Sequence, residues 1–150
     1  MNAKAIPQPD IFAKLVNQWE QASMKLEAIA EAIPAQKFDF RPTDGVRTVA
    51  EVLRHVAFWN LYVSDTVRGR KAQDSANELP KEKYATKQQI LSALKRSARE
   101  AAEGLRGSSP AARDEAAEMV LTFIEHNCEH YGQLAIYARL NSIVPPASRG

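Results

Sequence analysis

The chain has 150 residues, of which 45% are hydrophobic and 25% are charged, and its formal net charge is +2. This length fits a single domain over residues 1–150, and the composition excludes a disordered chain. Lys and Arg are scattered and no aromatic residues separate them, so we expect no nucleic-acid partner.

Cys128 is the only cysteine, which excludes an internal disulfide and fits a reducing cytoplasm. Residues 1–7 lack a long apolar stretch, and no run elsewhere approaches the length of a bilayer span. We therefore expect a cytoplasmic protein without a membrane segment.

The first amphipathic segment covers about residues 10–33, and Pro34 ends it. Its apolar residues recur in steps of four and three, which predicts a helix with one buried face. These residues are Leu15, Trp19, Ala22, Leu26, Ile29 and Ile33.

A second helix is predicted from Thr48 to about Arg68. Thr48 and Glu51 have the spacing of a capping box, which marks the start of a helix. Two neighbouring lines of residues follow: Val49, Leu53, Val56, Asn60 and Val63 on one, and Val52, His55, Trp59 and Tyr62 on the other. Trp59 and Tyr62 either form the wall of a pocket or fill the core.

Residues 69–85 are polar and include Pro80, so they form a long surface connection. Thr86 and Gln89 then have the spacing of a second capping box. This pattern predicts a third helix to about Arg106. Its inner face would consist of Leu91, Leu94, Ala98, Ala101 and Leu105.

The fourth helix is predicted from about Pro110 to Leu140, with Pro110 as its first residue. One stripe along it contains Met119, Phe123, His126, His130, Gln133 and Tyr137. The sequence therefore predicts an all-α fold, a four-helix bundle without strands. Residues expected in its core include Leu26, Leu53, Val56, Leu94, Phe123 and Leu134.

The chain has three histidines, and their placement is its most specific chemical signal. His126 and His130 are four residues apart, so they project about 40° apart from one helical face. His55 lies on an inward line of the second helix and could complete a set of three imidazoles around a divalent cation. The alternative is that each is a hydrogen-bonded core histidine.

The segment from His126 to His130 also has the pattern H-x-x-E-H of inverted zincins. That motif requires a downstream acidic ligand, and no Asp or Glu follows His130, so we reject a protease. Glu129 could act as a general base, although a solvated position is favoured. Cys128 should point away from the histidines as a small packing residue, and Gly132 suggests a close helix approach.

Two stretches of the chain resemble the DinB/YfiT-like family. The first contains Phe40-Arg41-Pro42 and Arg47-Thr48-Val49-Ala50-Glu51-Val52-Leu53-Arg54-His55-Val56, which is similar to the signature of that family's second helix. The second is His126-Asn127-Cys128-Glu129-His130-Tyr131-Gly132-Gln133-Leu134, which is similar to the signature of its fourth helix.

This resemblance implies a bundle with up-up-down-down connectivity and a long crossover between helices two and three. It also implies a divalent metal, commonly zinc or nickel with iron or manganese as further candidates, bound by His55, His126 and His130. Characterised relatives include transferases and isomerases that depend on low-molecular-weight thiols.

Three functions follow as hypotheses. The leading one is a metal-dependent transferase in which a low-molecular-weight thiol attacks an electrophile. The second is a metal-dependent hydrolase that uses bound hydroxide, and the third is a binding or regulatory bundle with a structural or vestigial metal. No catalytic residue beyond the candidate ligands is identified, and the small-molecule substrate stays unassigned.

The resemblance also favours a homodimer. Phe58 and Leu61 lie beyond the main apolar line of the second helix, and their exposure would favour a partner helix. The alternative is that the N-terminal segment or the long connection covers them within one subunit.

Overall fold

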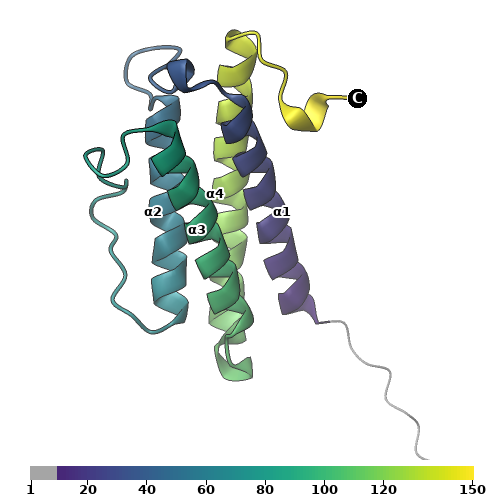
Figure 1. Ribbon diagram of the computed structural model, residues 1–150. Helices are drawn as coiled ribbons and strands as arrows, with labels where there is room; N and C mark the ends of the chain where they lie inside the picture. Colours follow the sequence, from purple (N-terminus) through teal and green to yellow (C-terminus); the bar gives the residue numbers. More distant parts are fainter. Residues whose placement is uncertain (1–9) are drawn as a thin grey trace, which may run out of the picture.

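The computed structural model describes residues 10–150, which form four helices and no strand (Figure 1). The helices are α1 (Ile11–Ala32), α2 (Val49–Val67), α3 (Lys87–Arg106) and α4 (Arg113–Leu140). Three short 3-10 turns accompany them: η1 (Ala35–Lys37), η2 (Pro110–Ala112) and η3 (Pro146–Ser148). The predicted all-α four-helix bundle is confirmed, and the expectations about residues 1–9 lie outside the described residues.

The helix starts follow from side-chain caps that satisfy free backbone N–H groups. The Asp10 carboxylate accepts a hydrogen bond from Ala13 N at 3.0 Å at the start of α1. Both predicted capping boxes are formed, at Thr48 for α2 and at Thr86 for α3. Pro110 begins the 3-10 turn η2 instead of α4 itself, so the fourth helix starts three residues later than predicted.

The helices run up, down, down and up in chain order (Figure 1). An ion pair between Asp10 and Arg113 (3.3 Å) holds the starts of α1 and α4 together. Arg106 at the end of α3 pairs with Glu20 near the start of α1, so these two helices are antiparallel.

The long crossover between α2 and α3 is present, but the order of directions differs from the up-up-down-down order that the resemblance implied. Ala50 N donates to Phe38 O (2.9 Å), so the first connection folds back and α2 starts beside the end of α1. Residues 68–86 then run back along the length of α2, so α3 is parallel to α2 (Figure 1). The crossover therefore joins two parallel helices.

The helices pair unequally: α2 approaches α3 closely and α1 approaches α4 closely, whereas α2 and α4 are farther apart. Two apolar clusters fill the interior, and all six residues that the sequence placed in the core are buried. They are Leu26, Leu53, Val56, Leu94, Phe123 and Leu134. The predicted core is confirmed.

Two buried hydrogen bonds between helices lie inside the bundle, and each helix contributes one polar residue to one of them. Asn60 Nδ2 of α2 donates to Ser97 Oγ of α3 at 3.2 Å. Asn127 Nδ2 of α4 donates to Ser23 Oγ of α1 at 3.1 Å. Each of the two close helix pairs is thus held in register by one buried Asn–Ser bond.

The crossover covers part of the outer face of α2. Arg54 Nε donates to Glu78 at 2.7 Å, and Leu79 N donates to Arg54 O at 3.3 Å. Phe58 is only 7% exposed and Leu61 is half-buried, and both lie beside Leu79. The crossover therefore covers them within one subunit, and they give no reason to expect a partner helix.

Two expectations for α4 are wrong. Cys128 is exposed and does not serve as a packing residue. Gly132 is also exposed, and a Cβ added there would meet no atom within 4 Å, so it does not mark a close helix approach. Both residues lie on the outer face of α4, which no other described helix covers. No helix within residues 10–150 combines the length and the apolar composition that a bilayer span requires.

Candidate metal centre

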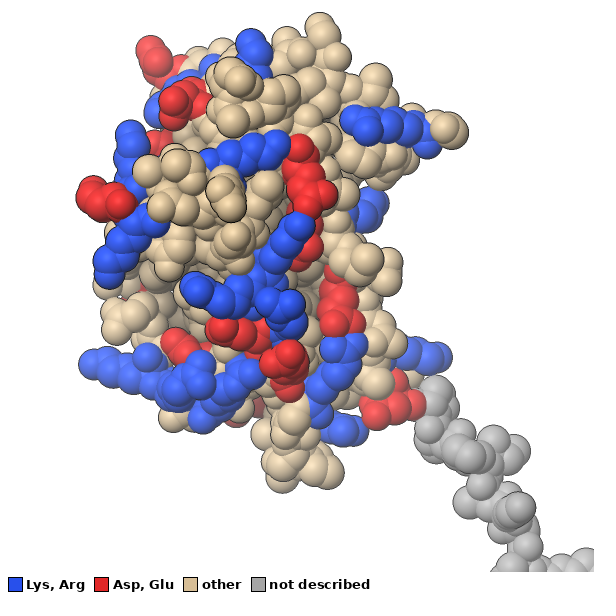
Figure 2. All heavy atoms as spheres, in the orientation of Figure 1, with Lys and Arg blue, Asp and Glu red and all other residues tan. Residues whose placement is uncertain are grey.

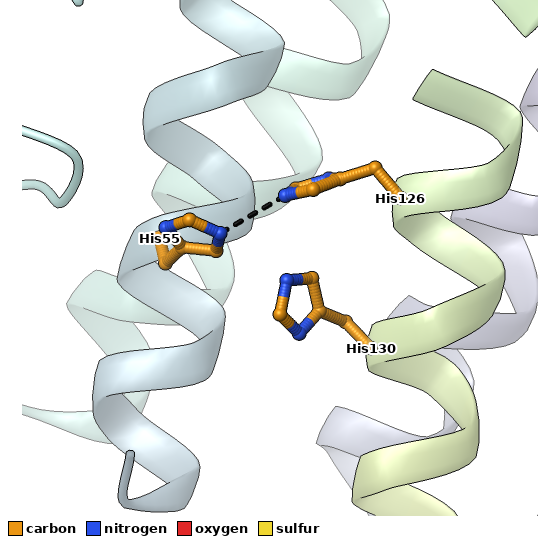
Figure 3. A group of neighbouring side chains, drawn as sticks. All are labelled: His55, His126 and His130. Atoms are coloured by element: carbon orange, nitrogen blue, oxygen red, sulfur yellow. Dashed lines mark hydrogen bonds between the residues drawn. The ribbon is translucent and has the colours of Figure 1, made fainter. Parts of the chain in front are cut away.

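Three imidazoles meet between α2 and α4 (Figure 3). His55 comes from α2, and His126 and His130 come from successive turns of α4. Their candidate ligand nitrogens all lie within 4.8 Å of one another, and the Nε2 atoms of His55 and His126 are 3.0 Å apart. The structure thus brings together the three histidines that the sequence selected.

The two α4 histidines lie at the edge of the buried face of that helix, not at its centre. The least exposed residues of α4 form one line, which consists of Val120, Asn127, Leu134 and Ala138. At 100° per residue, the His126–His130 line is about 85° from it and faces α2. Both imidazoles are accordingly half-buried, whereas His55 is buried. This position gives the site an approach from outside the bundle.

The crossover determines which nitrogen of His55 carries the proton. His55 Nδ1 lies 2.7 Å from the backbone oxygen of Asn77, and a carbonyl oxygen only accepts, so Nδ1 must donate. The Nε2 lone pair therefore points toward the other imidazoles. Trp59 Nε1 donates to Asn77 Oδ1 (2.8 Å) and so fastens this part of the crossover to α2.

A relay of hydrogen bonds gives His130 the same protonation pattern. The Tyr137 hydroxyl donates to Arg47 O (2.9 Å), so its oxygen accepts from Gln133 Nε2 at 2.8 Å. Gln133 Oε1 then faces His130 Nδ1 at 2.9 Å and accepts its proton. The His130 Nε2 lone pair is therefore free to face the centre. Such partners of the second ring nitrogen orient the histidine ligands of metal sites.

His126 completes the set in a different way. Because His55 Nε2 is an acceptor, His126 Nε2 carries the proton that lies between them. His126 Nδ1 is buried and has no hydrogen-bond partner within residues 10–150. Ring-nitrogen lone pairs thus converge on a centre with only one shared proton, and one ring nitrogen has no partner within the same residues. Protein groups alone satisfy such an arrangement poorly. This donor set fits a divalent cation with a preference for nitrogen ligands.

The environment keeps the imidazoles neutral, which is the protonation state that binds metal. Burial lowers the pKa of His55 from 6.5 to about 4, against the opposing effect of its bond to Asn77. Burial, with the neighbouring imidazoles, lowers the pKa of His126 to about 3. Burial also lowers the pKa of His130, and the positive charge of Arg47 lowers all three values further.

Aromatic rings surround the imidazoles on one side. The Trp59 ring lies 6.4 Å from that of His55, and the Phe123 ring lies 5.6 Å from that of His126. Trp59 and Tyr62 line a groove, so the pocket-wall alternative of the sequence analysis holds for them. Glu129 is exposed, in agreement with the solvated position that was favoured.

Sequence reasoning missed most of the supporting residues. Asn77 acts on His55 through its backbone oxygen and lies in a connection without periodic pattern, so no sequence signal pointed to it. Arg47 and Tyr137 are brought together only by the fold. Gln133 was visible, because it lies three residues after His130 on the same stripe.

The structure is therefore an all-helical bundle in which the antiparallel helices α2 and α4 bring together three imidazoles that could hold a metal ion. The sequence profile of the DinB superfamily matches residues 18–134, a range that includes all three histidines. The chain therefore belongs to the DinB superfamily. No curated protein matches the chain.

Proposed function

We propose that the protein binds one divalent metal ion through His55, His126 and His130. The observation that carries this proposal is the convergence of their ring nitrogens, with the Nδ1 protons of His55 and His130 held by Asn77 O and Gln133 Oε1. Nitrogen donors without carboxylates favour zinc or nickel, with iron or manganese as weaker candidates.

We further propose that the protein is a metal-dependent transferase that uses a low-molecular-weight thiol. A bound metal ion at this site would lower the pKa of a thiol or water and polarise an electrophile. The protein's own residues orient the three imidazoles, and the Trp59 and Phe123 rings border them on one side. The half-buried positions of His126 and His130 leave room for a small co-substrate.

Elemental analysis of untagged protein tests the metal proposal. One equivalent of metal is expected in the native protein and in Cys128→Ser, a control at an exposed residue between the two α4 histidines. His55→Ala and His126→Ala should each lose it. Full occupancy in both alanine variants would overturn the proposal.

An activity screen distinguishes the transferase from the two alternative functions. It measures turnover of a panel of electrophiles with and without glutathione, bacillithiol or mycothiol. Activity that requires both metal and thiol is expected. Thiol-independent hydrolysis would support the hydrolase instead. A stoichiometric metal without turnover of any substrate would favour a binding or regulatory bundle.

We also propose a cytoplasmic homodimer, now from a different surface. Leu121, Cys128 and Ile136 are exposed along the outer face of α4, and large apolar side chains there would be covered by a second copy. The single exposed thiol suits a reducing compartment. Light scattering should give twice the monomer mass, and Leu121→Lys with Ile136→Lys should halve it; a native monomer would overturn the dimer.

A further inference from the structure

A groove of about 550 Å³ lies between the second half of α2 and the first half of α4. It runs about 12 Å along α4 from Phe123 to Glu115, at 1.5 Å per residue. Its walls include Trp59, Tyr62, Met119 and Phe123, and the turn before α4 contributes at its far end. This volume is typical of sites for small molecules.

The groove begins where the candidate metal centre ends. Trp59 is one turn after His55 on α2, and Phe123 is one turn before His126 on α4. Their rings are 5.9 Å apart, and each also contacts the neighbouring imidazole. None of the three histidines lines the groove itself, so a molecule in it would have one end against Trp59 and Phe123, the two rings that border the imidazoles.

The charges around the groove are negative. Glu115 and Glu118 line it, and no Lys or Arg does. Residues 114–138 contain five Asp or Glu and no Lys or Arg, although the whole chain has a net charge of +2.

The two carboxylates of the groove have no basic partner in the described part of the chain. Neither Glu115 nor Glu118 forms an ion pair within residues 10–150. On the face that α1 and α3 present, by contrast, acidic and basic side chains alternate (Figure 2), and Lys95 pairs there with Glu31. Negative charge is therefore left at the groove without a partner among the described residues.

We propose that this groove binds the non-reacting part of the substrate, and that this part is an organic cation with an apolar or aromatic body. This inference rests on the proposed metal-dependent function. Ring faces of Trp59, Tyr62 and Phe123 attract cations and bury apolar surface, and the two carboxylates match the positive charge. The reactive group of such a substrate would extend past the Trp59 and Phe123 rings toward the imidazoles.

The same charges exclude an anionic co-substrate from the groove. A thiol that carries carboxylates, such as glutathione, would meet Glu115 and Glu118 without any compensating cation. The groove thus selects the electrophile, and the thiol approaches the imidazoles from another direction.

Calorimetric titration of the metal-free, full-length protein tests this directly. The probe is 4-phenylbutylammonium, compared with the anion 4-phenylbutanoate and the neutral 4-phenylbutanol. At low salt the ammonium is expected to bind at least about ten-fold more tightly than the carboxylate. The indole N–H resonance of Trp59 should shift on addition of the ammonium.

Variants locate the binding. Thr122→Trp fills the groove from an exposed wall position and should abolish binding, whereas Leu121→Trp, its exposed neighbour outside the groove, should not. Glu115→Gln with Glu118→Gln should remove the preference for the cation, and Glu125→Gln is the matched control. This second pair keeps the test decisive if Thr122→Trp fails to fold.

Absence of ammonium binding, equal affinity for the carboxylate, or full binding by Thr122→Trp would overturn the inference. Metal uptake by the same proteins is measured separately, in preparations from which metal has not been removed. Metal without ammonium binding would refute the groove alone, and ammonium binding by a protein that takes up no metal would refute the proposed function alone.

Discussion

The two close helix pairs and the interface between α2 and α4 contain different kinds of side chains. The α2/α3 and α1/α4 pairs are joined by buried aliphatic side chains and by one Asn–Ser hydrogen bond each. The α2/α4 interface instead contains three imidazoles, a group of aromatic rings and a groove. The comparison shows that the α2/α3, α1/α4 and α1/α3 interfaces hold the bundle together and that the α2/α4 interface is left for chemistry.

The largest expected effect is on metal binding across α2/α4. His126→Ala should weaken metal binding about 1,000-fold. The free energy of metal binding reaches roughly 10–16 kcal/mol in structural zinc sites, and one of three ligands would provide about a third of it. Competition with a chromophoric chelator measures the affinity. Because the three other interfaces hold the helices, the metal-free variant should still unfold cooperatively. A molten variant would contradict the division between interfaces.

The opposite result is expected in the α2/α3 pair. Leu94→Ala removes a side chain that is 1% exposed and should lower the free energy of unfolding by roughly 2–5 kcal/mol through lost burial and a cavity. Urea denaturation measures this loss. Metal stoichiometry should be unchanged, and a loss below about 0.5 kcal/mol would show that this pair does not carry the stability.

A smaller effect is expected from the relay behind His130. Gln133→Leu removes the acceptor for His130 Nδ1 and should weaken metal binding by about 10–100-fold. Gln133→Glu retains an acceptor and is the matched control. Equal affinity in the Leu variant and the native protein would show that the relay does not orient the ligand.

A gradual effect of pH is expected on the stability of the metal-free protein. His55 and His126 have pKa values of about 4 and about 3 in the folded state and an ordinary value of 6.5. Between those limits the unfolded chain binds protons that the folded chain does not, so stability falls as the pH is lowered from about 6.5 toward 3. Urea midpoints at pH 7 and pH 5 should show this fall, and His126→Gln should reduce it. A pH-independent midpoint in the native protein would contradict the shifts.

Local signals predicted the bundle well. The capping boxes at Thr48 and Thr86 fixed the starts of α2 and α3, because a cap depends on residues only three positions apart. The shared orientation of His126 and His130 was equally predictable, since helical geometry alone places both on one face. The direction of α2 could not be predicted from local signals, because it depends on how the first connection folds back at Phe38.

The same limit explains the errors within α4. The stripe through His126 was correct as a line but lies at the edge of the buried face, and Cys128 and Gly132 lie on the uncovered outer side. Sequence periodicity gives the relative angles of residues around a helix. It does not say which neighbouring helix each angle faces, and that depends on the whole bundle.

The bond from His55 to the crossover has a consequence for how this site tolerates change. Its acceptor is a main-chain oxygen, so no substitution at position 77 deletes it. Asn77 has a φ of 57°, so Gly would suit the backbone there, and a saturation scan would chiefly report the loss of the Trp59 contact. Insertions and deletions in residues 68–86 would be far more damaging, because they move the oxygen itself. His55 therefore constrains the length of this surface loop more than its amino-acid sequence.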